Sequence, residues 1–154
     1  MGRIPLLLAF ILVAACDSQE QTGDHDRLTD MATRYAAAWS SQDPAALASF
    51  YAADGVLTVN DGTPAVGRAA IEATARAFMT AFPDMVVRLE RLETEGDTVV
   101  FRWHWTGTNT GPGGTGNPVD IHGYEEWTLN DDRQIVQSLG HYDDAEYQRQ
   151  VNAN

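Results

Sequence analysis

A glutamate at position 125 stands among apolar residues on one face of a predicted strand. The segment VDIHGYEEWTL, residues 119–129, alternates so that Ile121, Glu125 and Trp127 share that face. Burial among such residues raises the pKa of a carboxyl, and a neutral carboxylic acid donates a hydrogen bond to a developing enolate. The strand therefore predicts an acid that faces a pocket. The structural alternatives are an ion pair with an arginine such as Arg102, or a bulge that turns Glu125 outward.

Three histidines lie in consecutive predicted strands, at positions 104, 122 and 141, and three histidines are a known zinc-ligand set. Alternation puts His104 opposite the aromatic face of residues 101–105 and His122 opposite Glu125, so the three need not share a face. The chain also has no short-spaced pair of ligands, so we expect neither a metal nor a cofactor. His141 is the histidine best suited to a lone proton-transfer role.

Four tryptophans fall on the predicted inner faces: Trp39, Trp103, Trp105 and Trp127. Such residues pack cores, and they also form an aromatic wall for a flat apolar ligand. A glycine-rich loop at 111–117 lacks the preceding strand and following helix of a phosphate-binding loop, so we interpret it as a hairpin connection. These features favour a small apolar ligand over a nucleotide.

The predicted elements that position these residues are helices first and strands afterwards. Periodicity, caps and turn residues indicate helices at 27–39, 44–52 and 67–82, and strands at 55–61, 85–95, 98–111, 119–129 and 134–143. This order predicts an α+β domain in which three N-terminal helices pack against a curved, mainly antiparallel sheet. The chain has 154 residues and a net charge of −12, which makes nucleic acid an unsuitable partner.

The first sixteen residues have the layout of an exported protein. One arginine precedes an apolar run and small residues before Cys16, the only cysteine, and the segment VAAC resembles a bacterial lipobox. A plain signal peptide, or an N-terminal helix that is never cleaved, is the alternative. We expect a signal peptide at 1–15, a tether at 16–26 lipidated on Cys16, and one domain at 27–154. The resemblance implies an extracytoplasmic, membrane-anchored lipoprotein on the periplasmic side.

Two sets of motifs carry a family resemblance. The segment WTGTNTGPGGTGNPVDIHGYEEWTLNDDRQIV and the later HYDDAEYQRQV resemble the SnoaL-like polyketide (ester) cyclases, and RYAAAWSSQDPAALASFYAADGVLTV resembles ketosteroid isomerases. Both belong to the nuclear transport factor 2-like superfamily, and the resemblance covers about residues 27–150. It implies a cone-shaped α+β fold and a pocket at its open end, shared by enzymes and plain binders.

The isomerase resemblance assigns roles to two residues and leaves a third role, that of the catalytic base, without a matching residue. Glu125 falls where those enzymes keep a protonated aspartic acid in the oxyanion hole, and Tyr35 falls on their oxyanion-hole tyrosine. Where they carry the base that moves the proton, this chain has Val59. Asn60 and Asp61 are the nearest polar residues, so we expect them to assist.

The cyclase resemblance also leaves its base unfilled, because Gly140 occupies the position of the catalytic aspartate. His141 and Asp143 lie close by without matching the motif, and we expect them at the site as a proton-transfer and a ligand-contacting residue. The resemblance implies a protein that binds a small apolar or polycyclic molecule and catalyses a proton-transfer isomerisation or cyclisation. The alternative is a binding or interaction lipoprotein without catalysis, dimeric through an outer sheet face that presents Arg102, His104 and Thr106.

Overall fold

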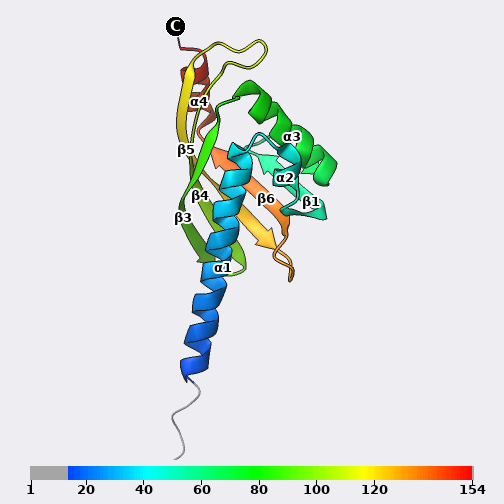
Figure 1. The fold of residues 1–154 in the computed structure, drawn as a ribbon, viewed down its shortest axis with the longest axis vertical. Coiled ribbons are helices and arrows are strands. Elements are labelled where there is room, and N and C mark those ends of the chain that lie inside the picture. Colours follow the sequence, from blue (N-terminus) through cyan, green and yellow to red (C-terminus); the bar gives the residue numbers. More distant parts are fainter. Residues whose placement is uncertain (1–13, 154) are drawn as a thin grey trace, which may run out of the picture.

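The computed structural model describes residues 14–153, and for residues 14–22 it describes the helical backbone alone. The predicted signal peptide therefore lies almost entirely outside the described residues. The elements in chain order (Figure 1) are α1 (Ala14–Ser40), α2 (Pro44–Ala48), β1 (Tyr51–Val59), β2 (Ala65–Val66), α3 (Arg68–Ala81), β3 (Val86–Glu95), β4 (Thr98–Thr108), β5 (Pro118–Leu129), β6 (Ile135–Tyr142) and α4 (Asp144–Val151). No helix in the described part of the chain is long and apolar enough to cross a membrane.

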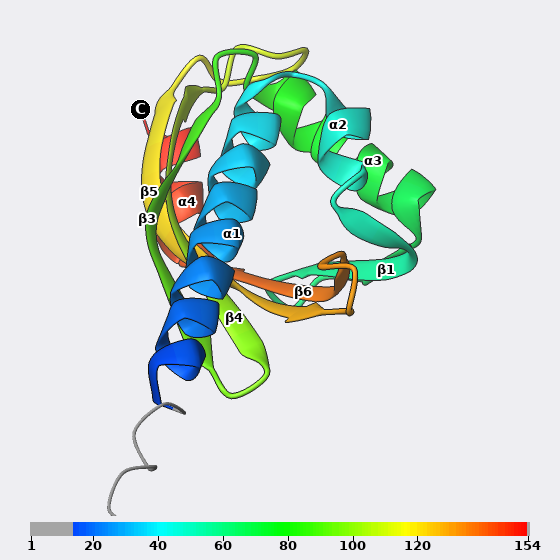
Figure 2. The same cartoon turned by 60° about the horizontal axis from the view of Figure 1, so that its bottom comes forward.

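The six strands form one curved sheet in the order β2-β1-β6-β5-β4-β3. Neighbouring strands are antiparallel except β1 and β6, which run parallel. Helices α1, α2 and α3 lie on the concave side of this sheet (Figure 2), with α1 against β3 and α3 against β1. The α+β prediction of three helices against a mainly antiparallel sheet is confirmed.

Several element boundaries differ from the predicted ones. Helix α1 begins at Ala14 and so runs through residues 16–26, which we expected to be a tether. Helix α2 is shorter than predicted, because β1 already begins at Tyr51. A further helix near the C-terminus, α4, was not predicted from the sequence. Asp143 caps it by accepting a hydrogen bond from the backbone N–H of Glu146.

The core lies between α1 and the concave face of β4 and β5. Phe101 and Trp127 stack with ring centroids 4.8 Å apart, and the Tyr35 ring packs edge-on against both. All three are fully buried, because strand alternation turns every second side chain of β4 and β5 towards α1. This packing fixes the inner face on which Glu125 lies.

Candidate functional site

Glu125 is a buried carboxyl whose oxygen Oε2 accepts three hydrogen bonds. Its donors are the hydroxyl of Tyr35 at 2.9 Å, Nε1 of Trp127 at 2.9 Å and the hydroxyl of Ser138 at 2.6 Å. They come from α1, β5 and β6, so the position of the carboxyl depends on the packing of these three elements. The predicted inward orientation of Glu125 is confirmed, and its structural alternative is not observed: Arg102 pairs with Glu93 at 2.6 Å.

A second tyrosine extends this network away from Glu125. The hydroxyls of Tyr35 and Tyr51 lie 2.8 Å apart. A tyrosine has one proton to donate, and that of Tyr35 goes to Glu125, so Tyr51 donates to Tyr35. Burial, together with the nearby Glu125 carboxylate, raises the pKa of both tyrosines well above the ordinary value. Both therefore remain protonated donors at all physiological pH values.

The pKa of Glu125 is raised from the ordinary value, because burial penalises the charged form. The hydrogen bonds from Ser138, Trp127 and Tyr35 act in the opposite direction and lower the pKa. With three donors on Oε2, the proton that Glu125 gains or loses belongs to the other oxygen, Oε1.

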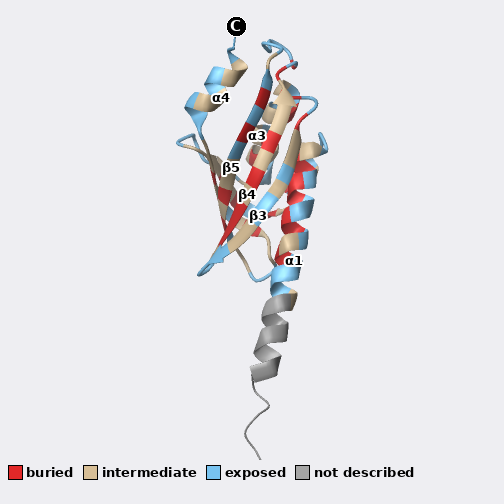
Figure 3. Ribbon diagram, turned by 90° about the vertical axis from the view of Figure 1, so that its left-hand side faces the viewer, coloured by how far each residue is buried: buried red, intermediate tan, exposed pale blue. Residues whose placement is uncertain are grey.

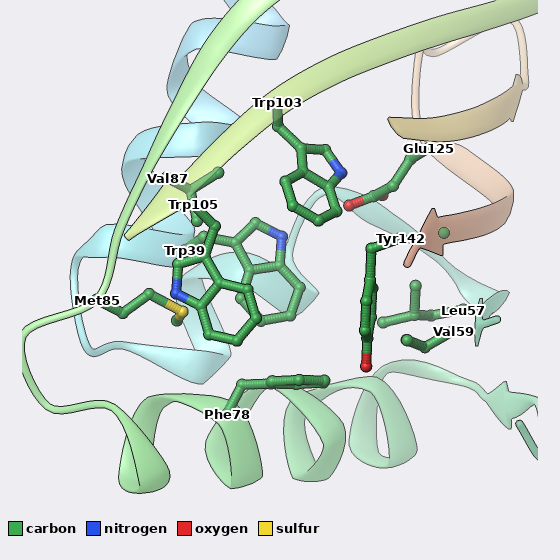
Figure 4. Close-up of a pocket in the computed structure, with 11 residues that line it drawn as sticks. Trp39, Leu57, Val59, Phe78, Met85, Val87, Trp103, Trp105, Glu125 and Tyr142 are labelled. Atoms are coloured by element: carbon green, nitrogen blue, oxygen red, sulfur yellow. The ribbon is translucent and has the colours of Figure 1, made fainter. Parts of the chain in front are cut away.

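A cavity of about 60 Å³ lies directly in front of this carboxyl, between α1, α3 and the inner face of the sheet. Figure 4 shows the Glu125 carboxyl turned towards a space bounded by aromatic rings, with the rings of Phe78 and Tyr142 seen edge-on along two of its sides. The cavity is lined by Trp39, Leu57, Val59, Phe78, Met85, Val87, Trp103, Trp105, Glu125, Gly140 and Tyr142. Glu125 is the one carboxyl among these residues, and none of them is basic.

The free oxygen of Glu125 is its contact with the cavity. Oε1 accepts no hydrogen bond from the described residues. It is nevertheless not among the buried polar atoms that lack a partner, because in the described part of the chain the one such atom is Nε1 of Trp105. Oε1 is therefore accessible, and the accessible side of Glu125 is the cavity. The site thus offers one carboxyl oxygen, which accepts a hydrogen bond when charged and donates one when protonated, within aromatic walls.

Two glycines shape the cavity in different ways. Gly123 of β5 lies across from Trp103 of β4, and a Cβ at position 123 would overlap the Trp103 ring and the carbonyl oxygen of His141. Glycine at this position lets the indole lie flat over β5. Gly140 of β6 lies across from Glu125, where a Cβ would meet only ordinary contacts at 3.5 Å and 3.7 Å. Its missing side chain leaves open space in the cavity.

The two positions at which the family resemblance implies a base, 59 and 140, both face the cavity. Val59 of β1 and Gly140 of β6 are paired in register, and both line the cavity. Neither residue is able to take up a proton. Glu125 is thus the only acid–base side chain of the cavity apart from Tyr142, whose pKa burial raises to about 12.

Two predicted site residues lie behind Glu125 and not in the cavity. Tyr35 and Trp127 are exposed neither to solvent nor to the cavity, since both are 0% accessible. Both donate to Oε2 of Glu125. Their hydrogen-bonding groups therefore act on a ligand only through Glu125. Of the predicted aromatic wall, Trp39, Trp103 and Trp105 line the cavity.

Four other predicted residues lie on the outer side of the sheet or beyond its edge. Asn60 has a positive φ of 47°, and its Oδ1 accepts from the backbone N–H of Tyr142, so it ties β1 to β6. Asp61 follows it and is exposed. His141 pairs with Glu126 at 2.9 Å on the face opposite the cavity, and Asp143 caps α4. These residues border a separate surface groove and do not contact the cavity.

Three hydroxyl-bearing residues of the site were not predicted from the sequence. Ser138 and Tyr142 share with Gly140 the inner face of β6, so the alternation of QIVQSLGHY carried the signal, and it also placed His141 outside. Tyr51 at the start of β1 was expected in a helix. Its role follows only from the contact with Tyr35, for which the sequence gives no local signal.

Solved structures with the same arrangement of elements come from several bacteria. A protein of ketosteroid isomerase-like fold from Catenulispora acidiphila DSM 44928, in complex with trimethylamine, superimposes with a TM-score of 0.69 and 22% identity over 79% of this chain and 92% of that chain. A protein of Jannaschia sp. CCS1 described as a SnoaL-like polyketide cyclase gives 0.66 and 20% over 76% and 88%. The epoxide hydrolase/cyclase-like enzyme SalBIII, of pyran ring formation in salinomycin, gives 0.68 and 16% over 80% and 95%.

These likenesses establish the nuclear transport factor 2-like fold, as the motifs predicted. No curated protein matches the sequence. The model of the SnoaL-like domain matches residues 32–138, which include the last third of α1, the whole cavity wall on β1 and β3–β5, and Ser138. The chain therefore belongs to the SnoaL-like domain family.

Proposed function

We propose that the protein binds a small, largely apolar organic cation in this cavity, with Glu125 as its anchor. The observation that carries the proposal is the accessible Oε1 of Glu125, because it is the one carboxylate oxygen in a cavity without any basic side chain. A protonated amine donates to this oxygen and places its alkyl groups against the surrounding rings.

The aromatic walls support a cation over a neutral ligand. The faces of tryptophan, tyrosine and phenylalanine rings attract a cation by about 0.5–2 kcal/mol each, most strongly when water is excluded. Trp39, Trp103, Trp105, Phe78 and Tyr142 surround the cavity. The net charge of −12 adds an attraction for cations at longer range. The protein from Catenulispora acidiphila with the same fold was crystallised in complex with trimethylamine, which is a ligand of this class.

The size of the cavity supports a ligand of a few non-hydrogen atoms. A bound water molecule requires about 10–15 Å³ of cavity volume. The cavity of about 60 Å³ therefore has room for about four to six water-sized groups. Trimethylammonium has four non-hydrogen atoms. The polycyclic ligands that the family resemblance implies are larger, and they would require the cavity to widen.

The proposal is binding without catalysis, because one carboxyl does not fill two roles at once. Enolate chemistry needs a base and a separate oxyanion donor. In this cavity Glu125 is the one carboxyl, so using it as the base removes it as the oxyanion donor. Tyr35 donates to it from behind, the predicted base positions hold Val59 and Gly140, and the other titratable side chain, Tyr142, has a pKa raised to about 12.

The test is calorimetric titration with three probes of similar size, on the wild-type chain and on Glu125→Gln. Trimethylammonium is a cation with an N–H donor, tetramethylammonium a cation without one, and tert-butanol a neutral donor. At a pH above the Glu125 pKa we expect affinity to fall in that order. A ligand of four atoms is limited to a Kd of about 0.05 mM or weaker. Glu125→Gln should weaken trimethylammonium binding by about 10- to 100-fold, because a hydrogen bond to a charged group contributes about 1.5–3 kcal/mol.

The neutral probe serves as the control for the cavity itself. Binding of tert-butanol should change little in Glu125→Gln, since glutamine keeps the shape of the side chain. Equal affinity for the three probes, or equal loss of all three in the variant, would contradict a cation site.

The alternative is a proton-transfer isomerase or cyclase in which Glu125 alone moves the proton. Its raised pKa and its free oxygen favour this alternative. Incubation of wild type with keto-ester and ketosteroid substrates in deuterated buffer, followed by mass spectrometry, separates the two. Deuterium incorporation or a rearranged product that is seen with wild type and disappears in Glu125→Gln would support catalysis and contradict the proposal of binding alone.

We also propose that the mature protein is anchored on the periplasmic side of the membrane through a lipid on Cys16. The support is the lipobox-like VAAC and the apolar run before it. Mass spectrometry of the membrane fraction should find a diacylglyceryl-modified N-terminus at Cys16. In Cys16→Ser the modification should be absent and the full-length precursor should accumulate.

We further propose a homodimer through the outer face of the sheet, where Arg102, His104 and Thr106 alternate with the inner aromatic residues. Figure 3 looks onto this face of β3, β4 and β5, which no helix of the described chain crosses. Light scattering should give twice the mass of the chain, and a monomer at all working concentrations would contradict the proposal.

A further inference from the structure

The outer face of β4 and β5 brings together two histidines and an aspartate. His104 on β4 and His122 on β5 are directly opposite in register. Asp120 precedes His122 by two residues, so its side chain points to the same face of β5. Alternation alone left open whether these histidines share a face; the structure places both on the outer one. This cluster lies on the opposite side of the sheet from Glu125.

The three side chains already point at one another. The rings of His104 and His122 stack at 4.4 Å with an angle of 10° between their planes, and Nε2 of His104 lies 2.7 Å from Oδ1 of Asp120. One potential ligand atom from each residue lies within 4.8 Å of the other two. Zinc binds nitrogen and oxygen ligands at about 2.0–2.2 Å in tetrahedral geometry, which corresponds to about 3.4 Å between ligands. The present separations bracket that value, and two of the three side chains, those of Asp120 and His122, are exposed and free to adjust.

A second carboxylate orients one of the two imidazoles. Oε2 of Glu90 on β3 lies 3.1 Å from Nδ1 of His122. A carboxylate that holds one ring nitrogen fixes the tautomer and leaves the other nitrogen, here Nε2, to bind a metal. His122 therefore has the arrangement of a metal-binding histidine, with its outer partner in place.

We propose that His104, Asp120 and His122 bind one divalent transition-metal ion of the zinc type, with Glu90 as the positioning residue for His122. Two imidazoles and a carboxylate suit zinc, cobalt and nickel more than magnesium or calcium, which prefer oxygen ligands alone. Asp120 and His122 are exposed in the single chain, so the fourth position is open there. Because His104 also lies on the face proposed for the homodimer, one ion per chain requires that the dimer contact leave Asp120 and His122 uncovered. Arg88 of β3 lies across from His104, and its positive charge repels a metal cation at this site. The net negative charge of the whole chain favours binding of the cation.

The test uses the purified full chain, without an affinity tag, titrated with Co²⁺ and then with Zn²⁺. Tetrahedral Co²⁺ has a characteristic visible absorption, and we expect it to saturate at one ion per chain and to be displaced by Zn²⁺. In Glu90→Gln binding should weaken by about 10- to 100-fold, the usual effect of losing such an outer partner. In His122→Gln it should weaken by more than that.

The matched control is His141→Gln, on the same outer face but paired with Glu126 and outside the cluster. It should bind Co²⁺ as wild type does, and circular dichroism confirms that each variant is folded. Arg88→Gln should strengthen binding, which a merely structural change would not do. The proposal is wrong if wild type shows no saturable binding, if half an ion is bound per chain, or if His141→Gln and His122→Gln weaken binding equally.

Discussion

Glu125 of β5 and Gly140 of β6 lie side by side on neighbouring strands, on the face of the sheet that lines the cavity. They are partners in register, and a Cβ at position 140 would lie 3.7 Å from Cγ of Glu125. The absence of a side chain at position 140 leaves open volume beside the Glu125 carboxyl. The cavity is therefore built around one carboxyl.

Alanine at the two cavity glycines should have opposite consequences. Gly140→Ala meets only ordinary contacts, so the free energy of unfolding should stay the same or rise by up to about 1 kcal/mol. Its methyl group should still weaken trimethylammonium binding, because it occupies the cavity. Gly123→Ala overlaps the Trp103 ring and a backbone carbonyl and should lower the free energy of unfolding by about 1–3 kcal/mol. Urea denaturation of both variants tests this; equal stability of the two would contradict it.

Tyr35→Phe should raise the pKa of Glu125 and lower stability. The variant removes one of the three donors that favour the charged carboxylate, and it leaves the hydroxyl of Tyr51 without its partner. Loss of a buried hydrogen-bond partner costs about 1–3 kcal/mol. The carboxyl resonance of Glu125 in ¹³C NMR reports the pKa. Ser138→Ala, which removes a donor to the same oxygen, should shift it in the same direction. A lowered pKa in either variant would mean that the donors do not stabilise the carboxylate.

The raised pKa of Glu125 makes its contribution to stability depend on pH with a definite sign. Between the ordinary value of 4.5 and the higher value in the folded state, the folded chain holds a proton that the unfolded chain has lost. Stability therefore falls as the pH rises through this window. Glu125→Gln does not titrate, so the stability of wild type relative to the variant should be constant below the window and decrease through it. A relative stability that increases with pH would contradict burial as the dominant influence on this carboxyl.

The sequence predicted the parts of the fold that depend on local patterns. Alternation in VDIHGYEEWTL placed Glu125 on the inner face, and the structure confirms it. Helical periodicity at 27–39 identified the part of α1 that packs on the sheet. Asp43 and Pro44 marked the start of α2. Such signals survive because they report which side of an element faces the core.

Contacts between distant elements were the part that local patterns did not reveal. Tyr51 was assigned to a helix, and its contact with Tyr35 depends on how β1 turns back beside α1. His141 was expected at the site because of its chemistry, although the alternation of β6 turns Gly140 and Tyr142 inward and His141 outward. In β6 the alternation of the strand predicts which side chains face the cavity better than their chemical type does.

The most direct test of the account is a pH titration of the Glu125 carboxyl by ¹³C NMR, with and without trimethylammonium chloride. The Glu125 resonance is identified by its absence in Glu125→Gln. A bound cation stabilises the carboxylate, so the account predicts that the Glu125 pKa falls as trimethylammonium is added, while the other carboxyls titrate as before. A Glu125 titration unchanged at saturating trimethylammonium would contradict the proposal that this carboxyl anchors a cation in the cavity.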